Sequence, residues 1–170
     1  KYANRRNITL EEAREFARLM DGQAGAICFK IFDGGKPASY GRTKLQGLTL
    51  VGTNEHFLVA NSYTLGYGRN LSPEDVVLAR NVAVVGPDVQ KKLFANESPI
   101  GKVIKLNEKP YQIIGVFTEK GSSFGQNQDR TVIVPISRSG PSSGADIIEW
   151  ICCVSIQASP SSCGKAWSAR

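Results

Sequence analysis

The hydrophobic pattern first indicates a helix near the start of the 170-residue chain. Thr9 and Glu12 have the spacing of a capping box, in which each side chain satisfies a backbone amide of the first turn. Apolar residues then recur at helical spacing, at Leu10, Ala13, Phe16, Ala17, Leu19 and Met20. This stripe predicts an amphipathic helix that packs on a core and ends at the glycines that follow, Gly22 and Gly25.

Short apolar segments with an extended pattern follow this helix. We expect strands over residues 26–32, 40–53, 82–85, 103–106, 112–117, 131–136 and 147–156. Gly34-Gly35 with Pro37 predicts the end of the first strand. Residues 107–110 have the length of a hairpin turn. Residues 82–85 are all apolar, which is typical of a strand buried on both faces.

Two further short helices are predicted among these strands. Ser72 is a suitable N-cap with Pro73 at the first helical position, so the acids Glu74 and Asp75 are better explained by helix capping than by acid–base chemistry. A second helix follows Gly86. Few helices among many irregularly grouped strands predict an α+β fold rather than a doubly wound parallel sheet.

The charge of the chain leaves its partner class open. A net charge of +6 and a pI near 9.3 are compatible with a polyanion such as nucleic acid. The basic residues are scattered, however, and the densest group is Lys1, Arg5 and Arg6, so we expect no nucleic-acid partner. No apolar run approaches the ~18–20 residues that cross a bilayer. A signal-peptide pattern is also missing. We therefore expect a part of a longer protein, with any membrane segments outside these residues.

The glycine-rich segments do not form a nucleotide site. Residues 66–71 begin like a dinucleotide fingerprint, but Leu71 stands where the third glycine belongs, and the next helix begins only after Ser72. Gly101-Lys102 is not a P-loop, because Asn96 stands where its first glycine belongs. The sequence thus predicts no cofactor, and an ATPase would be another domain or chain.

No catalytic constellation is predicted either. Residues 121–125 satisfy G-x-S-x-G around Ser123, but a nucleophile elbow needs a strand, a sharp turn and a helix, whereas this serine lies in a polar loop before a strand. The single histidine, His56, lies upstream, which is the opposite order to that hydrolase fold. Ser162 and Lys165 give only a nominal S-x-x-K in a polar tail. We predict no catalytic, cofactor-binding or metal-binding residue.

The chain has four cysteines, Cys28, Cys152, Cys153 and Cys163, without a C-x-x-C motif. A zinc ribbon or a thioredoxin-type site is therefore not expected. Cys152 and Cys153 are neighbours in an expected strand, so their side chains point to opposite faces and only one can meet Cys28 on a given face. Buried free thiols are favoured. A cross-strand disulfide from Cys28 is the alternative, and it would suit an oxidising compartment.

An ordered set of short motifs resembles one family. It consists of Val51-Gly52, Phe57, Gly68-Arg69, Asp75, residues 82–86, Leu93-Phe94, Ile100-Gly101-Lys102, Ile114-Gly115-Val116 and Val134-Pro135. With these gaps the set is similar to the extracytoplasmic core domain of MacB-type (FtsX-like) ABC-transporter permeases. In this resemblance the residues are structural: Gly86 and Gly101 permit tight turns, and Leu93 and Phe94 anchor a helix.

The resemblance implies a two-lobed fold on the periplasmic side of the inner membrane. One porter-like α/β sandwich lobe would comprise residues 1–65 with 139–170, and an inserted mixed α/β lobe residues 66–138. The domain would be non-catalytic and would couple cytoplasmic ATP hydrolysis to export by mechanical transmission. Its implied partners are a second permease copy, an ABC ATPase subunit or domain, and a periplasmic adaptor protein.

Two other functions remain open on the sequence. A lipoprotein-releasing permease domain belongs to the same superfamily, and a secreted or surface protein-binding module would have no connection to transport. The C-terminal residues depart from the family pattern, because residues 159–170 give at most a short amphipathic helix where a longer one leading to a membrane span is expected.

Overall fold

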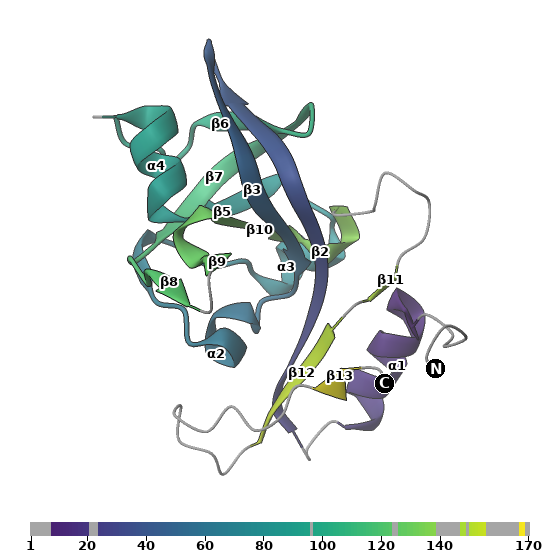
Figure 1. Ribbon diagram of the computed structural model, residues 1–170. Helices are drawn as coiled ribbons and strands as arrows, with labels where there is room; N and C mark the ends of the chain where they lie inside the picture. The colour runs from purple at the N-terminus through teal and green to yellow at the C-terminus, as the bar shows by residue number, and fades with distance from the viewer. Residues whose placement is uncertain are drawn as a thin grey trace, which may run out of the picture.

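The computed structural model describes residues 8–20, 24–95, 97–123, 126–138, 147–148, 150–155 and 167–168. Its elements are β1 (Ile8–Thr9), α1 (Leu10–Leu19), β2 (Ala24–Tyr40), β3 (Thr43–Thr53), α2 (Phe57–Asn61), β4 (Leu65–Gly68), α3 (Pro73–Val77), β5 (Val82–Val85), α4 (Pro87–Phe94), β6 (Val103–Leu106), β7 (Lys109–Phe117), β8 (Ser122–Ser123), β9 (Gln126–Asn127), β10 (Thr131–Pro135), β11 (Ile147–Ile148), β12 (Trp150–Ser155) and β13 (Trp167–Ser168), with 3₁₀ turns η1 (Gln128–Arg130) and η2 (Ile136–Arg138) (Figure 1). This mixed α/β arrangement confirms the predicted mixture of a few short helices with many short strands.

One mixed sheet connects most of these strands. Its order is β13-β12-β2-β3-β10-β5-β7-β4, and β6 pairs with both β2 and β7. The pairs β3–β10 and β5–β7 are parallel, and the other pairs in this sheet are antiparallel. The strands β2, β3, β10, β5, β7 and β6 therefore form a closed ring of hydrogen-bonded neighbours, which protects their edges.

Strand β2 extends from the α1 end of the molecule to the β6 end (Figure 1). The prediction that Gly34-Gly35 and Pro37 end the first strand is wrong. The pairing with β3 instead shifts register between Gly34 and Lys36 and between Lys36 and Ala38, and Gly35 takes a positive φ of 74°. Bulges let a strand accept an extra residue or a proline without ending, so β2 and β3 continue as one long hairpin.

Apolar side chains fill both faces of the ring. The larger cluster includes Leu48, Val85, Ile104, Ile113 and Val132, with Val89, Leu93 and Phe94 of α4. A second cluster on the other face joins Val51, Val84, Ile133 and Phe117 to Phe57 and Ala60 of α2. Each residue of β5 is buried, as its continuous apolar sequence predicts, because α4 and α2 contribute to the clusters on its two faces.

The predicted N-terminal helix is confirmed, including the capping box of Thr9 and Glu12. Its apolar stripe is only partly covered in the described structure. Ala13 is fully buried, whereas Phe16 is 38% and Leu19 is 67% exposed. Ala13 packs with residues of β2, α3 and η2 in a third cluster, so the small side chain lets the helix backbone approach the sheet.

Three details of the connections differ from the sequence expectations. Neither helix α2 nor strand β4 is among the elements that we expect from the sequence. The β6–β7 turn is shorter than predicted: Asn107 and Glu108 have φ of 47° and 69°, so β7 begins at Lys109. Two consecutive positive φ values are the signature of a tight two-residue hairpin turn. The polar loop that we expect around Ser123 contains the short pair β8–β9.

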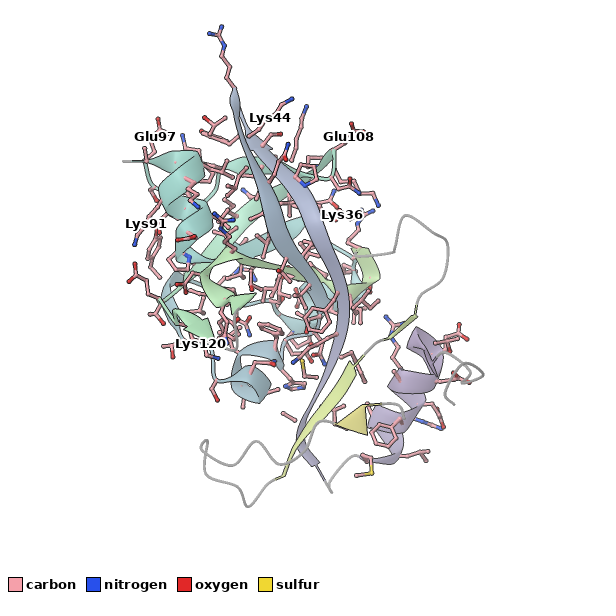
Figure 2. The ribbon with its side chains drawn as sticks, viewed as in Figure 1. Lys36, Lys44, Lys91, Glu97, Glu108 and Lys120 are labelled. Carbon is pink, nitrogen blue, oxygen red and sulfur yellow. The ribbon has the colours of Figure 1, made fainter. Side chains whose placement is uncertain are left out.

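The sheet crosses the predicted boundary between two lobes. β3, in the segment assigned to the first lobe, pairs with β10, in the segment assigned to the second. Charged side chains such as Lys44 and Glu108 lie near the upper end of the molecule in Figure 2, and Lys120 lies lower, near its middle. The division into residues 1–65 with 139–170 and residues 66–138 is not established by this arrangement and stays a prediction.

Candidate functional site

The residues that the sequence offered for catalysis have structural partners instead. His56 precedes α2, and its Nε2 lies 3.4 Å from Glu55 Oε1. The Cys28 thiol is free and buried beneath α2, 3.4 Å from Thr53 Oγ1. Burial raises the pKa of Cys28, which disfavours the thiolate that a nucleophile requires. Among the described residues, no group of three or more histidine, cysteine or acidic side chains is arranged to hold a metal ion.

The backbone register places one cysteine pair opposite each other. In the antiparallel pair of β2 and β12, Cys28 aligns with Cys152, and Ile27 aligns with Cys153. The expectation that at most one of the two neighbouring cysteines faces Cys28 agrees with this register. The favoured free thiol is confirmed for Cys28. The side chains of Cys152 and Cys153, and Cys163 as a whole, lie outside the described residues.

The hydrolase-like and nucleotide-like motifs have structural roles. Ser123 ends β8, which pairs with β9 rather than leading into a helix. Gly68 has a φ of 83°, and a Cβ there would lie 2.4 Å from the carbonyl oxygen of Ile114. Arg69 N donates to this same oxygen at 2.9 Å. The second glycine of the segment therefore permits close packing of β4 on β7, and it is not arranged as a phosphate loop.

Asp75 is the most strongly perturbed acid in the described structure. Its side chain is fully buried, and its Oδ2 lies 2.6 Å from Arg69 Nη1. Arg80 Nη1 donates to Oδ1 at 3.3 Å, and Ser72 N donates to Oδ2 at 3.0 Å. The capping box of Ser72 and Asp75 confirms the predicted capping role. Although burial opposes ionisation, these donors hold the pKa of Asp75 well below its usual range, so the carboxylate is structural.

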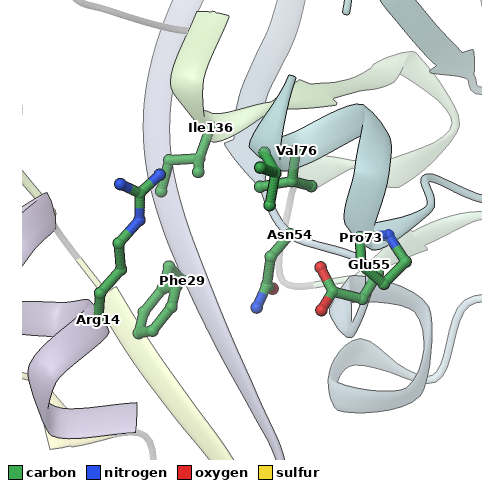
Figure 3. Close-up of a pocket in the computed structure, with 8 residues that line it drawn as sticks. Arg14, Phe29, Asn54, Glu55, Pro73, Val76 and Ile136 are labelled. Atoms are coloured by element: carbon green, nitrogen blue, oxygen red, sulfur yellow. The ribbon is translucent and has the colours of Figure 1, made fainter. Parts of the chain in front are cut away.

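The candidate site is a pocket of about 420 Å³ between α1 and α3. Figure 3 shows Arg14 and Phe29 on one side of it, and Asn54, Glu55 and Pro73 on the other. Val76, Val77 and Ile136 complete the described lining. A cation, an anion and an amide thus surround an apolar floor. These side chains can bind a ligand or contact a neighbouring element. They do not include a nucleophile paired with a base.

Asn54 is the most unusual residue of this pocket. It is only 7% exposed, and its Nδ2 donates to the carbonyl oxygen of Ile27 at 2.7 Å. Its Oδ1 is buried without a hydrogen-bond partner among the described residues. A buried amide oxygen is normally paired with a protein donor or an ordered water. No sequence pattern indicates this role, because Asn54 lies in a segment that is typical of a turn.

A polar connection crosses the pocket from α1 to α3. Arg14 Nη2 donates to Ser137 Oγ at 3.4 Å, and Ser137 Oγ donates to the carbonyl oxygen of Val76 at 2.8 Å. Beneath it, Ala13, Phe29, Val76 and Ile136 belong to one apolar cluster. The helix α1 is therefore joined to α3 through η2 by both hydrogen bonds and packing.

Comparison with known proteins shows the class to which this fold belongs. The chain matches the MacB-like periplasmic core domain family over residues 2–162. It is a member of that family. This confirms the resemblance seen in the sequence motifs.

Individual relatives are named as ATP-binding/permease proteins. The macrolide export ATP-binding/permease protein MacB of Bdellovibrio bacteriovorus is 36% identical over 106 residues, which is 59% of this chain and 16% of that protein. The pyoverdine export ATP-binding/permease protein PvdT of Pseudomonas aeruginosa is 38% identical over 87 residues, 51% of this chain and 13% of that protein. The chain thus spans less than a fifth of the length of these relatives.

Solved structures share the fold. The periplasmic region of MacB from Actinobacillus actinomycetemcomitans has a TM-score of 0.73 at 22% identity, covering 92% of this chain and 69% of that one. The extracellular domain of the noncanonic ABC-type transporter YknZ from Gram-positive bacteria has a TM-score of 0.73 at 21% identity, covering 92% of this chain and 77% of that one.

Within the described residues, no helix has the length and apolar character needed to cross a membrane.

Proposed function

We propose that this chain is a non-catalytic periplasmic domain that couples cytoplasmic ATP hydrolysis to export by mechanical transmission. Family membership supports the transporter context. The relatives' names combine ATP binding with permease function, so the ATPase belongs to another part of the protein or to another chain. The whole protein is an inner-membrane protein in this proposal, with the present domain on the periplasmic side.

The observation that carries the proposal is the continuity of β2. This strand of 17 residues begins beside α1 and ends in the closed ring beside β6. At about 3.3 Å per residue it extends roughly 50 Å, allowing for its bulges. Hydrogen bonds to β12, β3 and β6 hold it along this length. A displacement at the α1 end would therefore move the ring as one body rather than being absorbed by a flexible linker.

The connection across the candidate pocket adds to this rigidity. Arg14 and Ser137 link α1 to α3, and the buried Asp75 fixes the first turn of α3. The proposed partners are a second copy of the permease, an ABC ATPase subunit or domain, and a periplasmic adaptor protein. Two relatives are named for different cargoes, a macrolide and pyoverdine, which favours a role in driving transport over selection of one molecule.

The first experiment compares the purified 170-residue chain with the full-length protein and its ATPase. We expect ATP binding and hydrolysis only in the full-length protein. Removal of this domain from the full-length protein should leave basal hydrolysis but abolish export, measured as the macrolide tolerance of cells in which the complete transporter has first been shown to raise that tolerance. Hydrolysis by the purified chain, or unchanged tolerance without the domain, would contradict the proposal.

A point variant makes the same test without a large deletion. Arg14→Ala removes the connection to Ser137, whereas Arg18→Ala removes only an exposed pair with Glu15 on the same helix. We expect Arg14→Ala to lower tolerance while ATP hydrolysis persists, and Arg18→Ala to behave like the natural protein. Equal effects of the two variants would argue against force transmission through this contact.

A further inference from the structure

Two lysines from distant parts of the sequence meet at the end of α2. Lys30 lies on β2, and Lys120 follows β7; Figure 2 shows Lys120 near α2 and β8. Lys30 Nζ donates to the side-chain oxygen of Asn61, and Lys120 Nζ donates to the backbone oxygen of Asn61 at 2.5 Å. The two ammonium groups therefore share a single neutral residue as their acceptor.

Aromatic rings supply the rest of their surroundings. Lys120 Nζ lies 4.1 Å from the ring centroid of Tyr63, and Lys30 Nζ lies 5.8 Å from that of Phe57. Such contacts favour a cation through the negative face of the ring. Among the described residues, neither ammonium group forms an ion pair with a carboxylate. Partial burial and the charge of Lys30 lower the pKa of Lys120, as expected for a partly buried cation beside a like charge.

These lysines line a cavity of about 420 Å³. Phe57 and Tyr63 belong to its apolar walls, and Gln128 and Thr131 add polar groups. An ammonium group has three donor hydrogens, so each lysine keeps donors beyond its bond to Asn61. The cavity combines unused cationic donors with room for an apolar body, which is the composition of a small-ligand site.

We infer that this cavity binds a small organic carboxylate, with its anionic group between Lys30 and Lys120 and its apolar part against Phe57 and Tyr63. The carboxylate supplies the negative charge that the two lysines lack in the described structure, and charge-assisted hydrogen bonds are the strong ones. The inference concerns a ligand of this domain and does not depend on the proposed mechanical role.

The test is a titration of the ¹⁵N-labelled 170-residue chain with benzoate, followed by amide NMR shifts. We expect saturable shifts at Asn61, Ser62 and Tyr63. Benzamide, which has the same ring without the charge, should bind at least about tenfold more weakly, because a charge-assisted contact is lost. Shifts that do not saturate, or equal binding of benzamide, would overturn the inference.

Variants separate this site from general attraction to a basic protein. Lys30→Gln and Lys120→Gln should each weaken benzoate binding by about tenfold. Lys44→Gln removes the same charge at a position well away from Lys120 (Figure 2) and should change benzoate affinity by less than about twofold, since its effect is screened. An unchanged amide spectrum away from the cavity verifies folding. An equal loss of benzoate affinity in the Lys44 variant would overturn the inference.

A further titration distinguishes a free small ligand in the cavity from an acidic side chain of a partner protein. The blocked peptide acetyl-Ala-Glu-Ala-amide presents a carboxylate without a ring that fills the apolar part of the cavity. We expect it to bind at least about tenfold more weakly than benzoate. Equal binding would replace the small-molecule assignment with a docking site for a partner's acidic side chain.

Discussion

Replacement of Asp75 by asparagine removes a charge from the base of α3 while keeping the shape of the side chain. Asp75 is fully buried and accepts hydrogen bonds from Arg69, Arg80 and Ser72. Loss of one member of a buried pair typically costs about 3–5 kcal/mol. The two arginines are half-exposed (50% and 46%) and regain water, so we expect a loss of about 2–3 kcal/mol in the free energy of unfolding.

The neighbouring acid provides a matched control. Glu74→Gln causes the same change in net charge, but Glu74 is 76% exposed and its Oε2 lies 3.6 Å from Arg80 Nη2. This exposed pair should contribute less than about 1 kcal/mol. Urea unfolding followed by circular dichroism measures the free energy of unfolding of both variants. In thermal unfolding, the melting temperature should fall by about 5–10 °C for Asp75→Asn and by little for Glu74→Gln.

The effect of Asp75→Asn should also depend on pH. The pKa of Asp75 is lowered in the folded state relative to the unfolded value of about 3.9, so its stabilisation is fully present above about pH 5 and is lost as the pH falls toward the folded pKa. The gap between the natural chain and the Asp75 variant should therefore narrow from about pH 5 to pH 3. A gap that is constant with pH, or equal losses for the two variants, would refute this reasoning.

Three further predictions concern the frame around the site. Gly86→Ala should destabilise the fold by about 3 kcal/mol or more in the same urea assay, because the new Cβ would lie 2.1 Å from the carbonyl oxygen of Asp129. The control variant Gly101→Ala should cost only about 1 kcal/mol, because Gly101 has a positive φ but open space around it. Glu108→Gly should raise the free energy of unfolding by about 0.5–1 kcal/mol, since glycine accepts the φ of 69° without strain, and a loss would contradict the turn assignment. Cys28 should resist alkylation in the folded chain at pH 8, measured by mass spectrometry, because it is buried and its pKa is raised; rapid labelling would contradict its burial.

Local rules predicted the features that depend on neighbouring residues. The capping boxes at Thr9 and Ser72, the buried strand β5 and the helix that follows Gly86 are all confirmed. Gly101 has the positive φ expected of a tight turn. Gly86 differs from its predicted role: its φ is −74°, and it is needed because the backbone of Asp129 passes close by.

Features that depend on distant residues could not be predicted. The end of β2 pairs with β6, where Ala38 is opposite Leu106. This distant pairing overrides the local tendency of Gly34-Gly35 and Pro37 to end a strand. The candidate pocket joins Arg14 to Ser137, and the lysine cavity joins Lys30 to Lys120. No spacing rule connects such positions, because only the closed sheet brings them together.

The central claim of mechanical transmission is tested by distances between spin labels in the full-length transporter. Labels would replace Arg18 on α1 and Arg42 at the tip of the β2–β3 hairpin, introduced through a non-canonical amino acid so that the native cysteines remain. Between nucleotide-free and ATP-bound states, the Arg18–Arg42 distance within one copy should stay constant within about 2 Å, and the Arg42–Arg42 distance between two copies should change by more than that. A constant distance between copies, or a change confined to the distance within one copy, would contradict a rigid body that moves with ATP binding.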